Sequence, residues 1–310
     1  MLRQILLTAS RSDMLRSAST SLPVARSVVN RFVAGESIAD AVGTTADVTA
    51  AGRLVSLDRL GEEVESAEGA EKTRDEYVDL IAALNANGLT AETEISVKLS
   101  ALGQLLAHDG ERMALELAHS IADRAAKAGT MITLDMEDHT TTDSTLEILR
   151  ALREEFPDTG AVLQAYLYRS EADAKDLATL GSRVRICKGA YDEPESVAFQ
   201  SRHEVDLAFV RCCKVLMEGD GYPMIATHDP TLIEISQALA IHNDRPKGSY
   251  EHQMLFGVHL EEQERLVREG ERLRVYVPYG SDWYGYLMRR MAERPSNLGL
   301  LARSVTGGGQ

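Results

Sequence analysis

The sequence is poor in cysteine, in long apolar runs and in basic residues, and each shortage excludes a class of protein. Only three of its 310 residues are cysteines, and their spacing is not that of a metal site. Three reduced thiols predict a reducing compartment such as the cytoplasm. No run approaches the roughly 18 consecutive apolar residues of a transmembrane helix. The formal net charge of −15 argues against nucleic acid as the main partner.

The N-terminal stretch differs from the rest of the chain in its charge. Met1–Gly35 contains five arginines, many serines and a single acid, Asp13. This composition is typical of a mitochondrial presequence, which would place the protein on the matrix side of the inner membrane. It also fits amphipathic helices packed against the rest of the chain, and this second interpretation is favoured.

Eight short β-branched or apolar runs follow Gly52 and predict eight strands. Most of the gaps between them have an amphipathic helical pattern, as in Glu111–Ala128 and Thr231–Ile241. Alternation of strand and helix is typical of a mainly parallel sheet. The predicted strands are Leu54–Leu60, Glu94–Leu99, Met131–Met136, Ala161–Tyr166, Arg183–Cys187, Met224–Thr227, Tyr250–Phe256 and Leu273–Val277.

Eight such units in about 250 residues favour closure into a (β/α)8 barrel. A doubly wound open sheet is the alternative, but no Gly-x-Gly-x-x-Gly fingerprint follows any predicted strand. We expect one domain over residues 1–310. It comprises an N-terminal helical arm (1–52) that includes a helix near Thr44–Ala51, a barrel (53–303) whose first helix begins within Glu62–Glu76, and a disordered tail (304–310).

Polar residues gather where the second and third predicted strands end. Alternation puts Ser96, Lys98 and Ser100 on one face of the second strand, and Thr133, Asp135 and Glu137 on one face of the third. Lys98 and Asp135 can pair across neighbouring strands, and a structural ion pair is as good an interpretation as a functional one. The acids near Asp135 could bind Mg²⁺, but the adjacent lysine argues against it, and no metal site is predicted.

The next three strands end in amide, cationic and small residues. Gln164 ends the fourth strand, Arg185 and Cys187 share a face of the fifth, and Gly189 and Ala190 follow it. Small residues after a strand let a flat or phosphorylated ligand approach backbone N–H groups. The sixth strand ends in Thr227 and His228, and a histidine in this position is more often a hydrogen-bonded structural residue than a catalytic one.

Near the end of the chain, adjacent arginines follow a tyrosine at helical spacing. Tyr286 lies three and four residues before Arg289 and Arg290, and Glu293 lies four and three after them. Two neighbouring guanidiniums repel each other unless an anion such as a carboxylate lies between them. An exposed Arg-Arg pair is the alternative. With the strand-end residues, this anion clamp suits a flat cofactor above a small carboxylate substrate.

These motifs together resemble the proline dehydrogenase family, from about Leu54 to Glu293. The strongest pieces are Arg185-Ile-Cys-Lys-Gly-Ala-Tyr191 and Tyr286-Leu-Met-Arg-Arg290-Met-Ala-Glu293. The supporting pieces are Val97-Lys-Leu-Ser-Ala101, Asp135-Met-Glu-Asp138, Gln164-Ala-Tyr166, Ala226-Thr-His228 and Tyr250-Glu-His-Gln-Met-Leu255. The length is similar to that of the short monofunctional bacterial members.

The resemblance implies a distorted (β/α)8 barrel with its last helix over the barrel mouth, and it implies bound FAD. It implies oxidation of L-proline to Δ1-pyrroline-5-carboxylate, with hydride transfer from C5 to flavin N5 and reoxidation by a membrane quinone. Arg185 would approach N5, and Asp135 would support the site. The remaining implied contacts are Met136, Gln164, Lys188, Gly189, Ala190, Tyr191, Thr227 and His228 to FAD, and Lys98, Leu255, Tyr276, Tyr286, Arg289 and Arg290 to substrate.

Two stretches depart from the family pattern. Asp192 stands where the fused members carry tryptophan, and the His252–Met254 stretch differs from the usual run before Leu255. These departures leave the contacts beyond the flavin ring and the local backbone geometry open. Two other functions also remain open: a Schiff-base aldolase that uses Lys98 or Lys188, and a carboxylate-binding barrel without turnover.

Overall fold

Eight parallel strands form a nearly closed barrel. The computed structural model describes residue 29, residues 31–61 and residues 64–293, without the side chains of residues 289–293. The strand order is β3-β2-β1-β8-β7-β6-β5-β4, and a single bridge from Thr133 to Gly160 joins β3 and β4. The bounds are β1 Leu54–Arg59, β2 Thr93–Val97, β3 Met131–Leu134, β4 Ala161–Gln164, β5 Arg183–Cys187, β6 Tyr222–Ala226, β7 Glu251–Leu255 and β8 Leu273–Tyr279.

The sequence prediction of a barrel is therefore confirmed, and the doubly wound alternative is wrong. The strand order begins at β3 and ends at β4, and the bridge from Thr133 to Gly160 joins these two ends, which an open sheet would leave apart. All eight predicted strands are present, with ends that shift by up to two residues.

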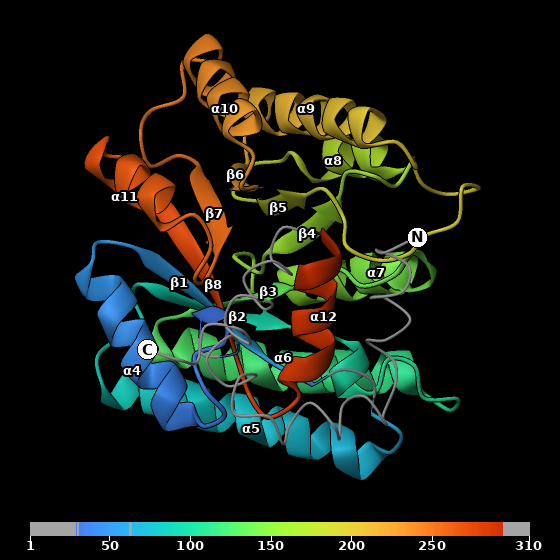
Figure 1. Ribbon diagram of the computed structural model, residues 1–310. Coiled ribbons are helices and arrows are strands. Elements are labelled where there is room, and N and C mark those ends of the chain that lie inside the picture. Colours follow the sequence, from blue (N-terminus) through green and yellow to red (C-terminus); the bar gives the residue numbers. More distant parts are fainter. Residues whose placement is uncertain (1–28, 30, 62–63, 294–310) are drawn as a thin grey trace, which may run out of the picture.

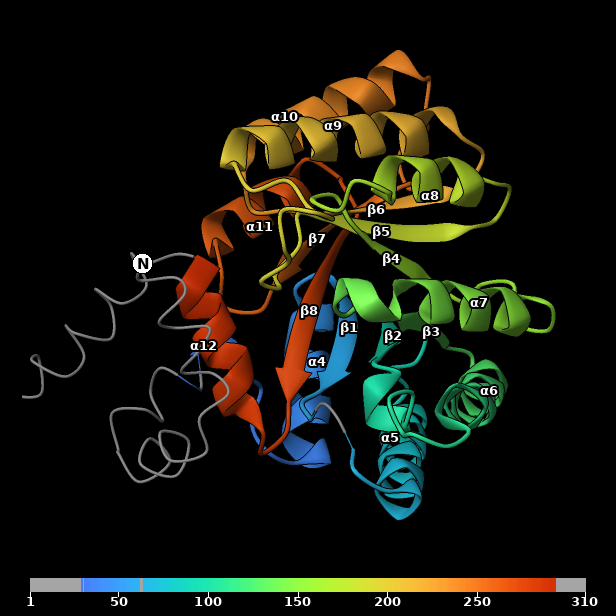
Figure 2. The ribbon, with the colours of Figure 1, turned by 90° about the vertical axis from the view of Figure 1, so that its right-hand side faces the viewer.

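Helices surround this barrel on its outer side (Figures 1 and 2). Ser37, Ser66, Ser201 and Asp229 start four of them by accepting a hydrogen bond from the first turn. The bounds are α4 Ile38–Ala50, α5 Ala67–Ala86, α6 Gly110–Ala128, α7 Thr142–Arg153, α8 Ser170–Leu177, α9 Arg202–Glu218, α10 Pro230–His242, α11 Leu260–Arg268 and α12 Trp283–Glu293, with 3-10 turns at Ser100–Leu102 and His139–Thr141.

The helix predicted to begin within Glu62–Glu76 starts at Ala67. Ser66 caps it, and α5 runs on to Ala86. The helical arm predicted over residues 1–52 includes α4, but most of residues 1–30 lie outside the described residues, as do the presequence question and the tail at 304–310.

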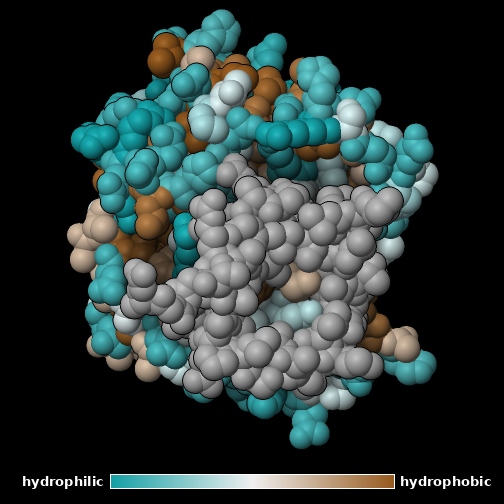
Figure 3. Space-filling view, in the orientation of Figure 1, coloured by the Kyte–Doolittle hydropathy of each residue, from teal (hydrophilic) through white to brown (hydrophobic). Residues whose placement is uncertain are grey.

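The main core lies between the strands and the helices. Outward-facing residues such as Val55, Leu57, Ile95 and Val97 are fully buried against the helices. Burial of each such side chain stabilises the fold by about 1.5–3 kcal/mol. The outer surface in Figure 3 is mostly hydrophilic, with apolar side chains visible over α9 and α10. The inner face of the barrel, by contrast, is strongly polar.

A second core joins the N-terminal segment to the last helix. Phe32 and Val33 pack in one cluster with Trp283, Tyr286 and Leu287 of α12. After β8 the chain turns back, so that α12 lies across the end of the barrel at which β8 finishes (Figure 2). The predicted position of the final helix, over the barrel mouth, is confirmed.

Candidate active site

The inner face of the barrel carries charged residues in successive layers. Side chains two positions apart on a strand share a face, and the later one lies closer to the strand's carboxyl end. Glu94, Arg183, Glu251 and Arg274 are the first inward-facing residues of their strands and form a layer that we name the charged floor. Ser96, Arg185, Gln253 and Tyr276 follow two residues later, at the level where barrel enzymes place their active sites.

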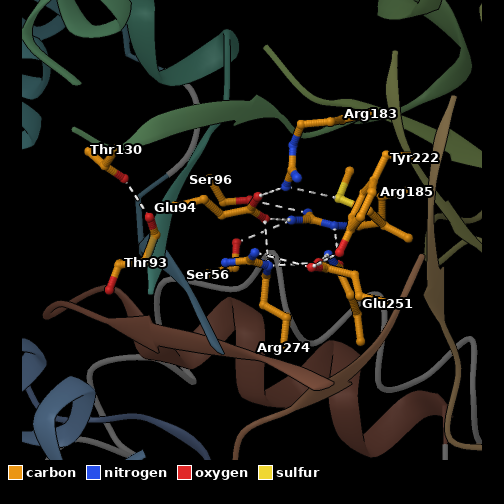
Figure 4. A network of polar contacts seen from close by, with 12 residues as sticks. Ser56, Thr93, Glu94, Ser96, Thr130, Arg183, Arg185, Tyr222, Glu251 and Arg274 are labelled. Carbon is orange, nitrogen blue, oxygen red and sulfur yellow. Dashed lines mark hydrogen bonds and ion pairs between the residues drawn. The ribbon is translucent and has the colours of Figure 1, made fainter. Parts of the chain in front are cut away.

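Ion pairs hold the charged floor together (Figure 4). Arg274 contacts both carboxylate oxygens of Glu251, at 2.7 Å and 3.1 Å, and Arg183 Nη2 lies 2.6 Å from Glu94 Oε2. Both carboxylates are fully buried. Burial opposes ionisation of Glu94, but the charges of Arg274, Arg183 and Arg185 outweigh it and lower its pKa to about 2. The floor is therefore ionised at neutral pH.

Arg185 lies above the floor and uses all five of its N–H groups. Its Nε donates to Gln253 Oε1 at 2.6 Å. Its Nη1 donates to Asp135 Oδ1 at 2.5 Å and to Ser96 Oγ, and its Nη2 donates to Glu94 Oε1 at 3.0 Å and to Ser56 Oγ. Burial opposes its charge, yet Asp135 and Glu94 raise its pKa. Arg185 is thus a fixed positive charge.

Asp135 joins Arg185 to Tyr276. The Tyr276 hydroxyl donates to Asp135 Oδ2 at 2.6 Å, and the Arg185 guanidinium lies 5.3 Å from the centre of the Tyr276 ring. Burial, and next the negative charge of Asp135, raise the pKa of Tyr276 well above its ordinary value. Tyr276 is therefore a neutral donor whose orientation is fixed by Asp135.

Lys98 pairs with an acid that sequence reasoning did not single out. Its Nζ contacts Asp58 of β1, whereas Asp135, the partner predicted from the sequence, pairs with Arg185. Position 98 faces β1 as well as β3, because β2 lies between those strands. Burial raises the pKa of Asp58, and Lys98 counteracts this shift.

The residues predicted after β4 and β5 lie together at the carboxyl ends of these strands. Gln164 Nε2 donates to the Glu137 carbonyl at 2.6 Å, and its Oε1 accepts from the Ala190 N–H. Gly189 has a φ of +113°, and a Cβ there would lie 2.4 Å from the Tyr166 ring. Only glycine fits this backbone. The half-buried stretch from Lys188 to Tyr191 therefore passes close above the strand ends.

Lys188 and His228 are held by neighbouring groups. Lys188 Nζ lies 2.5 Å from Asp206 and 3.3 Å from Asp229, which line a shallow groove of about 320 Å³ beside α9 and α10. His228 Nε2 accepts from the Leu255 N–H at 2.9 Å, which ties the end of β6 to β7. Met136 and Thr227 are buried at the ends of their strands.

The anion clamp lies on α12. The helix carries Tyr286, which is buried in the cluster with Phe32, and it continues through Arg289 and Arg290. The side chains of Arg289, Arg290 and Glu293 lie outside the described residues, so the clamp stays a prediction.

Sequence reasoning missed the residues that hold the predicted ones. Asp58, Glu94, Glu251, Gln253 and Arg274 are all buried inside the barrel. The signal that could have found them is the period-two alternation, because each lies two residues before or two residues after another inward-facing polar position. In the described part of the chain, no group of three His, Cys, Asp or Glu side chains could hold a metal ion.

A family model and full-length relatives of this chain carry the same description. The family model described as proline dehydrogenase matches residues 41–303. Proline dehydrogenase 1 of Bacillus subtilis subsp. natto is 36% identical over 305 residues, which cover 98% of this chain and 99% of the relative. Proline dehydrogenase of Deinococcus radiodurans is 38% identical over 283 residues, which cover 91% of each chain.

The solved structures support the fold. Proline utilization A (PutA) from Bdellovibrio bacteriovorus, inactivated by N-propargylglycine, superposes with a TM-score of 0.81 and is 24% identical. The match covers 92% of this chain and 34% of that longer chain. The structure of PutA from Bradyrhizobium japonicum, in a D778Y mutant form, superposes with a TM-score of 0.73 at 23% identity and covers 90% of this chain.

Proposed function

Because this chain belongs to the proline dehydrogenase family, we propose that it oxidises L-proline to Δ1-pyrroline-5-carboxylate with FAD as its cofactor and a quinone as the final electron acceptor. This is the first step of proline catabolism to glutamate. One observation carries the proposal beyond family membership. Arg185, Asp135 and Tyr276 form one hydrogen-bonded group at the carboxyl ends of the strands, beneath the helix that carries Arg289 and Arg290.

The strand ends fit a flat cofactor. The stretch from Lys188 to Tyr191 is half-buried, and the missing side chain of Gly189 leaves the backbone close to the Tyr166 ring. Gln164 orients the Ala190 N–H, and Met136, Thr227 and His228 surround the same end of the barrel. FAD, when bound, supplies the hydride acceptor. Arg185 contributes a fixed positive charge on the barrel side of that position.

The other residues in this proposal bind and orient proline. Arg289, Arg290 and Lys98 hold its carboxylate, and Asp58 holds the Lys98 ammonium in place. Leu255, Tyr276 and Tyr286 bound the ring, and α12 excludes water from it. Asp135 accepts hydrogen bonds from both the Tyr276 hydroxyl and the Arg185 guanidinium. It therefore fixes the positions of these two groups relative to each other.

The site of action follows from the acceptor. A quinone lies in a membrane, and among the described residues no helix is long and apolar enough to cross one. We therefore propose a cytoplasmic protein that contacts the inner membrane peripherally, through the arginine-rich segment before Leu22.

The two lysines argue against a Schiff-base aldolase. Lys98 pairs with Asp58, and Lys188 pairs with Asp206 and Asp229. An amine held in such an ion pair must leave its carboxylate partner before it can attack a carbonyl carbon. Borohydride treatment in the presence of substrate should therefore trap neither lysine.

An absorption spectrum tests the proposal. The purified protein should show flavin bands, and L-proline should bleach them under anaerobic conditions. A colourless protein that fails to take up added FAD would contradict the assignment. Flavin bands that proline leaves unchanged would favour instead a carboxylate-binding barrel without turnover.

A further inference from the structure

Gln253 connects Arg185 to the charged floor. It is nearly fully buried. Its Oε1 accepts from Arg185 Nε at 2.6 Å, and its Nε2 donates to Glu251 Oε1 at 2.7 Å. Glu251 in turn accepts hydrogen bonds from Nε and Nη2 of Arg274.

The charge of Glu251 fixes the orientation of this amide. Burial opposes ionisation of Glu251, but Arg274 outweighs it and lowers its pKa, so the carboxylate only accepts hydrogen bonds. The amide nitrogen of Gln253 must therefore face Glu251, which leaves its oxygen facing Arg185. An amide in the opposite orientation would set two acceptors against each other and two donors against each other.

The other contacts of Arg185 do not replace this one. The guanidinium terminus meets Ser56, Glu94, Ser96 and Asp135, which lie on β1, β2 and β3, whereas Gln253 reaches Nε from β7 on the other side of the barrel. Contacts to the terminal nitrogens hold the far end of the guanidinium. Gln253 holds its near end, at Nε, so the plane of the group is set from both ends.

We propose that Gln253 is a positioning residue, which sets the plane of the Arg185 guanidinium against the cofactor by transmitting the fixed geometry of the charged floor. The inference rests on the proposed function, because Arg185 is the group that faces FAD there. Gln253 itself touches neither substrate nor cofactor. Its loss should slow hydride transfer and leave proline capture unchanged, because the proposed carboxylate groups are Lys98, after β2, and the two arginines of α12.

Two near-isosteric variants of the holoenzyme separate positioning from packing. Gln253→Met fills the same space without either hydrogen bond. Tyr222→Phe is the matched control, because the Tyr222 hydroxyl donates to Glu251 Oε2 at 3.1 Å and its loss weakens the same network without touching Arg185. We expect proline to reduce the flavin of Gln253→Met about tenfold more slowly, or about 1.4 kcal/mol in the barrier. KM for proline should change less than about twofold.

A third variant guards against simple misfolding. In Gln253→Glu, a protonated carboxyl can donate to Glu251 and accept from Arg185, so the rate should recover relative to Gln253→Met. The recovery should fade as pH rises and the proton between the two carboxyl groups is lost. The charged groups that face this position are Glu251, Arg274, Arg185 and Glu94.

Crystal structures of the variants give a readout that does not depend on turnover. The Arg185 guanidinium should be displaced or rotated in Gln253→Met and unchanged in Tyr222→Phe. An unchanged rate in Gln253→Met, or an equal loss in Tyr222→Phe, would overturn the inference. If proline failed to bleach the flavin of the wild-type protein, the proposed function would be refuted instead. The crystal structures would still decide whether Gln253 sets the position of Arg185.

Discussion

The His252 ring is buried on the outer face of β7, with no hydrogen-bond partner among the described residues. It is 1% exposed, and within the described residues neither ring nitrogen makes a hydrogen bond. Glu271 is 4.0 Å away, too far for one. Burial lowers the pKa of His252 to about 4, whereas an unfolded histidine titrates near 6.5. The folded protein therefore holds this ring neutral.

The first prediction is a loss of stability between pH 6.5 and pH 4. The unfolded chain takes up a proton on His252 as pH falls below about 6.5, and the folded chain does so only near pH 4, so folding weakens across that window by about 3 kcal/mol. His252→Phe should lose less stability than wild type over the same range, and at pH 5 it should be more stable than wild type. Chemical denaturation at several pH values measures this, with His203→Gln, at an exposed position, as the control. Parallel pH profiles for wild type and His252→Phe would contradict it.

Tyr276 is the second residue whose role a substitution can isolate. If its ring faces the proline ring, its bulk occupies the space of a 4-hydroxyl group, so the enzyme should prefer proline to 4-hydroxyproline. Tyr276→Ser should narrow this preference, chiefly by lowering activity on proline, because the variant also loses the hydrogen bond to Asp135 and the ring beneath Arg185.

Tyr276→Phe separates these two causes. It removes the hydroxyl and keeps the ring, so it should lower kcat/KM for both substrates and retain the preference. Kinetics with both amino acids on all three proteins decide the matter. Equal kcat/KM for the two substrates in wild type would show that Tyr276 is not the selector.

At the scale of single residues, the sequence predicted which side chains meet at the barrel mouth. It did not predict the residues that form hydrogen bonds and ion pairs with them. Asp135 and Arg185 could be found because one lies near the end of the third predicted strand and the other lies within the fifth. The pairing of Lys98 could not, because an inward-facing lysine on β2 has acids on both neighbouring strands, and only the strand register brings Asp58 to it. Sequence spacing carries no information on that choice.

At the scale of elements, two glycines control different parts of the candidate site. Gly189 lies in the stretch after β5, with a φ of +113° and the Tyr166 ring against it. Gly257 follows β7 with a φ of +71°, and a Cβ there would lie 1.8 Å from the Arg31 carbonyl oxygen. The segment around Arg31 packs against α12 through Phe32. The first glycine therefore supports the proposed cofactor stretch, and the second supports the helix of the clamp.

The third prediction uses these glycines as mutual controls. Gly257→Ala should push the Arg31 segment away and displace α12, raising KM for proline about tenfold, or about 1.4 kcal/mol, while FAD stays bound. Gly189→Ala should instead lower FAD retention, because the stretch must move off Tyr166. Flavin absorbance per protein and KM for proline are measured in both. If both variants lost flavin and proline binding alike, the two elements would not act separately.

Elements were the easiest part of the fold to predict. Short β-branched or apolar runs located every strand, and β5 was predicted to the residue. The helix ends were harder to predict, because they depend on single capping hydrogen bonds. At α5, for example, Ser66 accepts a hydrogen bond from the Gly69 N–H and starts the helix inside an acidic stretch. Closure of the barrel was predictable from the number of units, but the register that aligns the charged residues was not.

The whole molecule combines a charged interior with an acidic exterior. Four acids and four bases, Asp58, Glu94, Asp135, Glu251, Lys98, Arg183, Arg185 and Arg274, are buried inside the barrel, and their formal charges cancel. Barrel interiors are more often filled by branched apolar side chains. Loss of one partner from such a pair costs about 3–5 kcal/mol, much of it from the charge left alone. The net charge of −15 therefore comes from the other charged residues of the chain.

The last prediction concerns membrane contact, and it depends on the negative net charge of the chain. An acidic molecule is repelled by anionic lipid, so attraction must come from a local basic segment, and the residues before Leu22 contain three arginines and one acid. Removal of this segment should abolish binding to vesicles of phosphatidylcholine with phosphatidylserine and slow turnover with a membrane quinone. Turnover with a soluble dye should be unchanged, which shows that the barrel is intact. Full-length protein should bind less in high salt, because screening shortens the range of the attraction, and it should ignore vesicles of phosphatidylcholine alone. Unaltered vesicle binding and quinone turnover after truncation would assign membrane contact to another surface, for which the apolar side chains over α9 and α10 are the next candidates.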